Sequence, residues 1–302
     1  MNLFSLHSFQ IRKLKDKLIG WWMYLGLAIV ILLPFLIGAG LYFKSSLLLE
    51  KTSLGNILFS LEWQPQNGKF GLLAFIIGSL WVTLLSVLIA VPVCILSAIH
   101  LTQYAKKWVL NLMRPVIDIL AGIPSVIYGI WGVIVVVPFV QHVGKLMGKS
   151  ISGYSILAGA IVLSIMITPF ILNILLEIFR TIPEELTEAS LSLGASRWET
   201  IKKVILRKAF PGIISAAGLG VSRAFGETIA VLMVVGNVVK IPDSLFQPGY
   251  PLPALIANKY GEMLSVPMYD SALMFSALVL FCIIICFNFL SRLAIVRFER
   301  RL

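Results

Sequence analysis

Six long stretches with almost no charge constrain the fold of this chain more than any other feature. Five of them run for 21 to 30 uncharged positions. These five lie between Lys17 and Lys44, Lys69 and His100, Asp118 and Lys145, Lys149 and Glu177, and Asp270 and Arg292. The sixth, between Lys208 and Lys240, has 31 positions and only two charges, Arg223 and Glu227. A helix needs about 20 apolar residues to cross the bilayer core, so the sequence predicts an all-α, polytopic membrane protein with six transmembrane helices.

Composition excludes the other broad classes. The chain is 59% hydrophobic and only 13% charged, about half the charge of a soluble domain. A transmembrane β-barrel would show alternating segments of about ten residues instead of continuous apolar runs. The first apolar run follows a basic stretch but is too long for the core of a cleaved signal peptide, so we expect a retained anchor.

The net charge of +11 is explained by its distribution between the two sides of the membrane. If six spans alternate, one set of connections, which includes both termini and residues 177–208, carries 17 Lys and Arg residues, and the other set carries seven. Cytoplasmic connections carry the excess of Lys and Arg. We therefore expect both termini to be cytoplasmic, the partner of the apolar surface to be lipid, and no nucleic acid to bind.

The residues needed for bond-making chemistry are missing from the predicted spans. The three histidines lie outside the spans or at their edges, and Cys282 and Cys286 have no histidine near them to complete a metal site. Residues 144–150 approach a phosphate-binding loop, but their first glycine is one residue too close to the second. We expect no catalytic residue, no metal site and no cofactor bound by this chain.

The connection at residues 181–208 has the signals of a helix, a tight turn and a second helix. Thr181 to Glu184 fits a capping box, and so does Ser196 to Glu199. Gly194 between them supplies a stop, since glycine readily adopts the left-handed conformation that ends helices. The apolar side of such an element packs on its own bundle or on lipid, or it docks into a groove on a cytoplasmic partner.

The same connection resembles a known motif. Glu188-Ala189-Ser190, followed by Gly194 and by Val204 and Leu206, is similar to the EAA loop of ABC importer permeases, with Ser190 in place of the second alanine and Arg207 in place of a proline. The resemblance implies that Glu188, Ala189 and Gly194 couple this chain to an ATPase subunit. ATP would then be used by that partner. Pro211 is expected to bend the chain in place of the missing proline.

Further segments resemble one subfamily, the PstC-type permeases of phosphate-specific transporters. The similar segments are residues 70–71, 76–80, 89–92, 120–129 and 223–230. The resemblance implies a MetI-like ABC importer permease domain at residues 63–302. Residues 1–62 would hold the N-terminal cytoplasmic segment, the first transmembrane anchor and the start of a periplasmic loop. It also implies a PstA-type permease partner, a PstB-type ATPase dimer, a PstS-type periplasmic phosphate-binding protein, and a place in the bacterial inner membrane.

Arg223 and Glu227 are the candidate residues of the translocation path. Arg223 lies 15 residues after Lys208 and 17 before Lys240, where a charge costs about 2.5–3.5 kcal/mol on insertion scales. In a continuous helix Glu227 would share its face. The two residues therefore form a self-neutralised pair that locks the bundle, or Arg223 faces a passing anion and Glu227 moderates its affinity. Charged residues at the matching positions of the family are implicated in phosphate passage, which favours the second interpretation.

A helix break is predicted in the third span. Gly122, Pro124 and Ser125 can interrupt a helix where it lines a cavity, although a simple packing kink has the same signature. The sequence thus favours a permease subunit that forms half of the path of an ATP-driven phosphate importer and is not itself an enzyme. A permease of the same fold for molybdate, sulfate or an amino acid, and a secondary anion transporter or channel, remain as alternatives.

Overall fold

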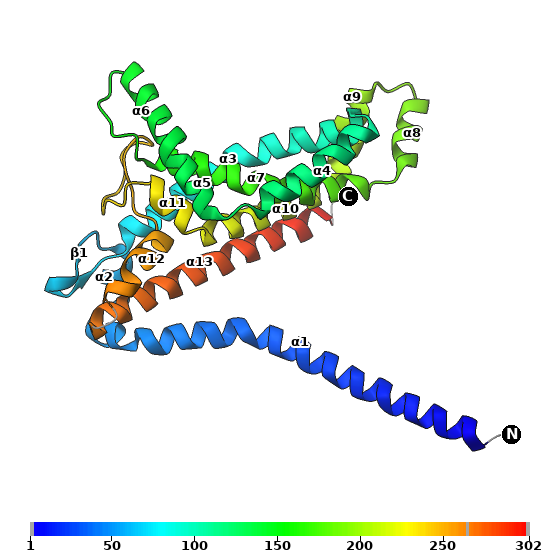
Figure 1. Cartoon of the computed structure of the whole chain (residues 1–302), viewed down its shortest axis with the longest axis horizontal. Coiled ribbons are helices and arrows are strands. Elements are labelled where there is room, and N and C mark those ends of the chain that lie inside the picture. Colours follow the sequence, from blue (N-terminus) through cyan, green and yellow to red (C-terminus); the bar gives the residue numbers. More distant parts are fainter. Residues whose placement is uncertain (1–2, 264–265, 300–302) are drawn as a thin grey trace.

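The computed structural model describes residues 3–263 and 266–299, and these are almost entirely helical (Figure 1). Six helical segments are long and apolar enough to cross a membrane, and each overlaps one of the six low-charge stretches. These segments are Lys15–Lys51, Leu73–Tyr104, Ser125–Leu146, Ile156–Arg180, Arg197–Gly226 and Pro267–Arg297. The prediction of an all-α protein with six spans is confirmed, and the strands described are limited to one short hairpin.

Most elements follow one another with short connections, and the longest connection, residues 235–251, lies between α11 and α12. The first half comprises α1 (Leu3–Lys51), α2 (Leu54–Phe59), β1 (Trp63–Gln64), β2 (Lys69–Phe70), α3 (Leu73–Ile99), α4 (Lys107–Gly122), α5 (Ser125–Trp131) and α6 (Val137–Leu146). The second half comprises α7 (Ile156–Arg180), α8 (Glu184–Ser192), α9 (Arg197–Thr200), α10 (Leu206–Gly226), α11 (Ile229–Val234), α12 (Leu252–Met263) and α13 (Pro267–Glu299). Three π-helical segments, His100–Tyr104, Gly132–Val136 and Ile201–Ile205, continue or join these helices.

Helix α7 is the centre of the bundle. It packs along α3 and against α10. In its most apolar 18-residue stretch 67% of the residues are buried, a larger share than in the corresponding stretches of the other five spans. Up to Leu172 its sequence is apolar around most of the circumference, the pattern of a helix surrounded by other helices. Leu163, Ile167 and Leu175 are fully buried on it.

Small residues let α10 approach both of its neighbours. A Cβ atom added at Gly220 would lie 2.6 Å from Cδ1 of Ile171 on α7. On the side facing α13, the Ser222 hydroxyl lies 2.6 Å from the Asn288 side-chain oxygen. Small residues and interhelical hydrogen bonds are the usual means of helix association in lipid, where the solvent does not drive apolar surfaces together.

A second core fastens the opposite end of the bundle. Trp63 of β1 makes edge-to-face contacts with Phe70, Phe75 and Tyr269, at ring-centroid distances of 5.7, 5.1 and 5.8 Å. Such pairs contribute about 0.5–1.5 kcal/mol each beyond their burial. The strand pair thereby joins the starts of α3 and α13.

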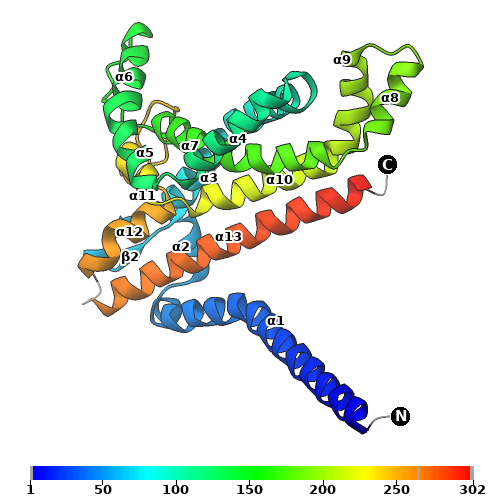
Figure 2. The ribbon, with the colours of Figure 1, turned by 45° about the vertical axis from the view of Figure 1, so that its right-hand side comes forward.

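The C-terminal part of α1 packs on α13, whereas its N-terminal part extends away from the bundle (Figure 2). Residues 15–37 are exposed in the isolated chain, except the half-buried Gly20. The aromatic pairs Trp21–Trp22 and Tyr42–Phe43 lie about 20 residues apart, roughly 30 Å along a helix. That length matches the hydrocarbon core, whose two interfaces favour such aromatic side chains. The start of α1 and the end of α13 lie at the same end of the molecule as α8 and α9.

Candidate functional site

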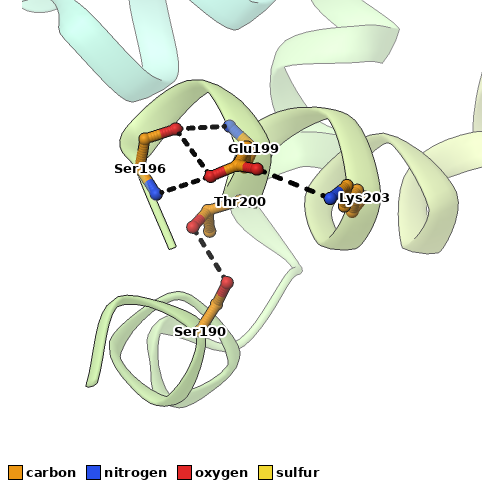
Figure 3. A network of polar contacts seen from close by, with 5 residues as sticks. All are labelled: Ser190, Ser196, Glu199, Thr200 and Lys203. Atoms are coloured by element: carbon orange, nitrogen blue, oxygen red, sulfur yellow. Dashed lines mark hydrogen bonds and ion pairs between the residues drawn. The ribbon is translucent and has the colours of Figure 1, made fainter. Parts of the chain in front are cut away.

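The first candidate site is the hairpin of α8 and α9. Gly194 has a φ of 85°, in the left-handed region, and its amide donates to the Leu191 carbonyl at 2.9 Å. After the turn, the Ser196 hydroxyl accepts from the Glu199 amide and the Glu199 carboxylate accepts from the Ser196 amide, at 3.3 and 3.1 Å (Figure 3). The capping box predicted at Ser196 and the stop predicted at Gly194 are confirmed.

Ser190 ties the two helices of this hairpin together. Its hydroxyl lies 2.9 Å from the hydroxyl of the buried Thr200, so one of the two donates to the other (Figure 3). Ser190 stands where the EAA pattern has its second alanine. The departure from the pattern therefore adds a hydrogen bond between α8 and α9.

One local prediction about this connection is wrong. Thr181 does not cap α8: it ends α7 in a helical conformation, and its hydroxyl donates to the Ile178 carbonyl at 2.8 Å. Helix α8 starts at Glu184, after Pro183, because an N-terminal cap needs an extended backbone and Pro183 has one. Pro211 lies inside α10, which continues through it, and the bend expected there stays a prediction.

Glu188 and Ala189 are exposed on α8. Beside Glu188 is a cavity of about 360 Å³, which Thr102, Arg180 and Thr187 also line. The cavity therefore joins α8 to the ends of α3 and α7. Its lining is mostly polar, with side chains of both charges.

The second candidate site lies where two spans are interrupted. Gly122 is the last residue of α4, Pro124 precedes α5, and Ser125 is its first residue. The fifth span is broken at Glu227, between α10 and α11. The two short helices that follow these breaks, α5 and α11, lie side by side (Figures 1 and 2). Interrupted helices supply free backbone groups and side chains to ligands in many transporters.

Arg223, in the last turn of α10, is exposed in the isolated chain. Its guanidinium carbon lies 4.7 Å from the ring centroid of Phe170 on α7. It is also close enough to Tyr128 of α5 for a Coulombic interaction. The Tyr128 hydroxyl donates to the Leu120 carbonyl at 2.9 Å, across the break between α4 and α5. The positive charge therefore lies against the Phe170 ring and within electrostatic reach of the break between α4 and α5.

The expectation that Glu227 shares a helix face with Arg223 is wrong. Glu227 follows the last residue of α10 and has an extended backbone, with φ −74° and ψ 127°. The two residues therefore do not share a helix face. The Glu227 carboxylate instead accepts from the Ala230 amide at 3.2 Å, which caps α11. Within residues 3–263 and 266–299, none of the ion pairs joins Glu227 to Arg223.

Sequence reasoning missed the polar contacts between α4 and α7. Asn173 donates to Asp118 at 2.9 Å, and Arg114 donates to Glu177 at 2.9 Å. Each helix contributes two polar residues with i, i+4 spacing, which places them on one face. That spacing is a signal in the sequence, but it does not say which helices meet.

The three cysteines differ in their exposure. Cys94 is buried, whereas Cys282 and Cys286 are exposed in the isolated chain. Both lie on α13, on a surface left free for lipid or another subunit. The described part of the chain holds no group of three or more His, Cys, Asp or Glu side chains that could bind a metal ion.

Comparisons with known proteins identify the family. The family model described as "Binding-protein-dependent transport system inner membrane component" matches residues 90–302. The chain belongs to this family. Residues 90–302 lie inside the predicted permease domain 63–302, and where that domain begins stays a prediction.

Two curated relatives illustrate the range of this transport family. The probable ABC transporter permease protein YqgH of Bacillus subtilis is 41% identical over 249 residues, which cover 82% of this chain and 79% of the relative. The phosphate transport system permease protein PstC of Xylella fastidiosa is 37% identical over 261 residues, which cover 82% and 80%. The resemblance to PstC-type permeases is thus confirmed.

A solved structure of the MetNI methionine ABC transporter has the same fold. It covers 73% of this chain and 91% of its own, with a TM-score of 0.52 and 21% identity. The prediction of a MetI-like ABC importer permease fold is confirmed. The family consists of transport components, so the chain is not expected to be an enzyme.

Proposed function

We propose that this chain is the PstC-type permease subunit of an ATP-driven importer of inorganic phosphate and forms half of its translocation path. The observation that carries the proposal is the exposed Arg223 next to the helix break at Glu227, with no ion pair to it among the residues that the structure describes. An ionisable residue inside a membrane faces protein or water, because lipid exposure is costly. A guanidinium presents planar paired donors that suit phosphate oxygens.

In this proposal Glu227 acts beside Arg223 without pairing to it. Its carboxylate caps α11 and lines a small cavity with Ser79 and Thr83 of α3. A negative charge near the path lowers the affinity for an anion, which allows phosphate to leave. Gly122, Pro124 and Ser125 act by interrupting the third span, so that Tyr128 of α5 is brought near Arg223.

The α8–α9 hairpin is the proposed contact with the ATPase. Glu188 and Ala189 would lie in a cleft of a PstB-type ATPase dimer, and Gly194 would keep the turn tight. ATP would bind and react in that partner, whereas a PstA-type permease would complete the path. A PstS-type periplasmic protein would deliver phosphate at the opposite end. The hairpin and both termini would be cytoplasmic in a bacterial inner membrane, and residues 1–62 would form the predicted N-terminal segment and anchor.

Radiolabelled phosphate uptake tests the proposal. Cells that lack this chain should take up little phosphate through this system, the wild-type chain should restore uptake, and Arg223→Gln should not. Excess unlabelled phosphate should compete with the label, whereas sulfate and molybdate should not. Competition by sulfate or molybdate at equal concentration would assign another anion to the same fold.

A further inference from the structure

Arg114, midway along α4, and Arg180, the last residue of α7, share one carboxylate. Nη2 of Arg114 lies 2.9 Å from Oε1 of Glu177, and Nη1 of Arg180 lies 3.8 Å from the same oxygen. Each guanidinium carries five N–H donors, so most of them are left over after these contacts. The side chains of Arg114 and Arg180 are 37% and 33% exposed, which keeps the spare donors accessible.

Glu177 lies on the same face of α7 as Phe170, the residue that contacts Arg223. Phe170, Asn173 and Glu177 are spaced i, i+3 and i+7, which places them on one face of the helix. Phe170 contacts Arg223, and Asn173 donates to Asp118. Glu177 lies about 10 Å further along the helix axis than Phe170. Polar contacts therefore continue from Arg223 to the end of α7 that leads into α8.

We infer that Arg114 and Arg180 form a second oxyanion site at the cytoplasmic end of the path, and that Glu177 acts as its internal competitor. The inference rests on the proposed function and extends it from the path to the release of the anion. Guanidinium groups bind carboxylate and phosphate oxygens through the same planar donors. An arriving phosphate would engage the spare guanidinium donors when it displaces Glu177.

The position of Arg180 connects this site to the coupling hairpin. Arg180 lines the cavity that Thr187 and Glu188 of α8 also line. Three residues separate the end of α7 from the start of α8, so a displacement of α8 is transmitted to Arg180. In this inference phosphate is released next to the α8–α9 hairpin, which is predicted to move with the ATPase.

The test uses the complete transporter, with its ATPase and binding protein, reconstituted in vesicles whose lumen corresponds to the cytoplasm. Each variant's initial uptake is measured at increasing luminal inorganic phosphate and compared with its own uptake into an empty lumen. Glu177→Gln removes the competitor, so half-inhibition should need about tenfold less luminal phosphate, the effect of one charge-assisted hydrogen bond. Half-inhibition of Arg114→Gln and of Arg180→Gln should each need more luminal phosphate than half-inhibition of the wild type. Glu62→Gln breaks the exposed pair with Lys69 near the opposite end and should cause no shift.

Several outcomes would overturn the inference. One is that luminal phosphate inhibits uptake by Glu177→Gln as it inhibits the wild type. If Glu177→Gln fails to assemble, wild-type inhibition in both arginine variants would overturn the inference instead. Another is a shift seen in vesicles with anionic lipids but lost in purely zwitterionic ones, which would assign the arginines to lipid headgroups. Uptake into vesicles without luminal phosphate tests the proposed function separately. If the wild-type transporter shows no such uptake, both the proposed function and this second site are rejected.

Discussion

The Arg223 guanidinium lies over the Phe170 ring, 4.7 Å from its centroid, and is not paired with Glu227 four residues later. An exposed cation–π contact contributes about 0.5–1 kcal/mol. This is enough to orient the arginine but does not neutralise it. The charge therefore remains available to an anion, as a translocation path for phosphate requires.

Removing the charge of Arg223 should abolish most phosphate uptake without loss of the protein. Arg223→Gln should reduce uptake by at least about tenfold, because a charge-assisted hydrogen bond to the anion is lost. Since Arg223 and Glu227 do not pair, the double variant with Glu227→Gln should transport no better than the single one. Membrane abundance is measured alongside uptake; full uptake by an abundant double variant would restore the salt-bridge interpretation.

Phe170 should tune the affinity of the path. Phe170→Leu keeps an apolar side chain of similar size but removes the π face under Arg223. We expect the half-saturating phosphate concentration to change by about two- to fivefold, in line with the energy of one cation–π contact. Phe289→Leu, at an exposed aromatic of α13, is the matched control. Equal kinetics for the two variants would mean that the ring does not position the arginine.

Gly194 should be needed for coupling because of its backbone conformation. No atom lies within 4 Å of a Cβ built there, so Gly194→Val introduces strain at φ 85° without a clash. The left-handed conformation costs a residue that carries a Cβ atom roughly 1–2 kcal/mol. We expect normal membrane insertion with weaker ATPase co-purification and lower uptake. Gly148→Val has an equally open site at φ 73° in the connection between α6 and α7 and should leave ATPase binding intact. Loss of ATPase binding in both would point to general strain.

The contact between α7 and α10 should depend on Gly220. Gly220→Leu places a side chain where Cδ1 of Ile171 lies 2.6 Å from the added Cβ, and overpacking of this kind costs about 1–3 kcal/mol. Membrane abundance and thermal stability in detergent should both fall. Gly26→Leu on the exposed part of α1, where nothing lies within 4 Å, should change neither.

The predicted orientation can be checked with single cysteines in a background without the native ones. Ser152 and Ser196 are exposed and lie in connections that the charge distribution places on opposite sides. An impermeant maleimide should label cysteine at position 152 in cells with a permeabilised outer membrane, and should label position 196 only after the inner membrane is opened. Labelling of position 196 in intact spheroplasts would reverse the orientation.

The sequence by itself determined the number of spans, because the length of an uncharged run decides whether a helix can cross the bilayer. It also determined the turn at Gly194 and the cap at Ser196, which depend on residues a few positions apart. It predicted a break at Gly122 to Ser125 for the same local reason.

Only the tertiary structure decided which side chains meet. The fifth span is interrupted at Glu227, so spacing along a presumed continuous helix placed Glu227 beside the wrong partner. Arg223 lies instead over Phe170 of α7, and Arg114 meets Glu177 across α4 and α7. Such contacts depend on how whole helices pack, and in lipid that packing follows from shape and small residues such as Gly220. A single sequence does not specify which helices become neighbours.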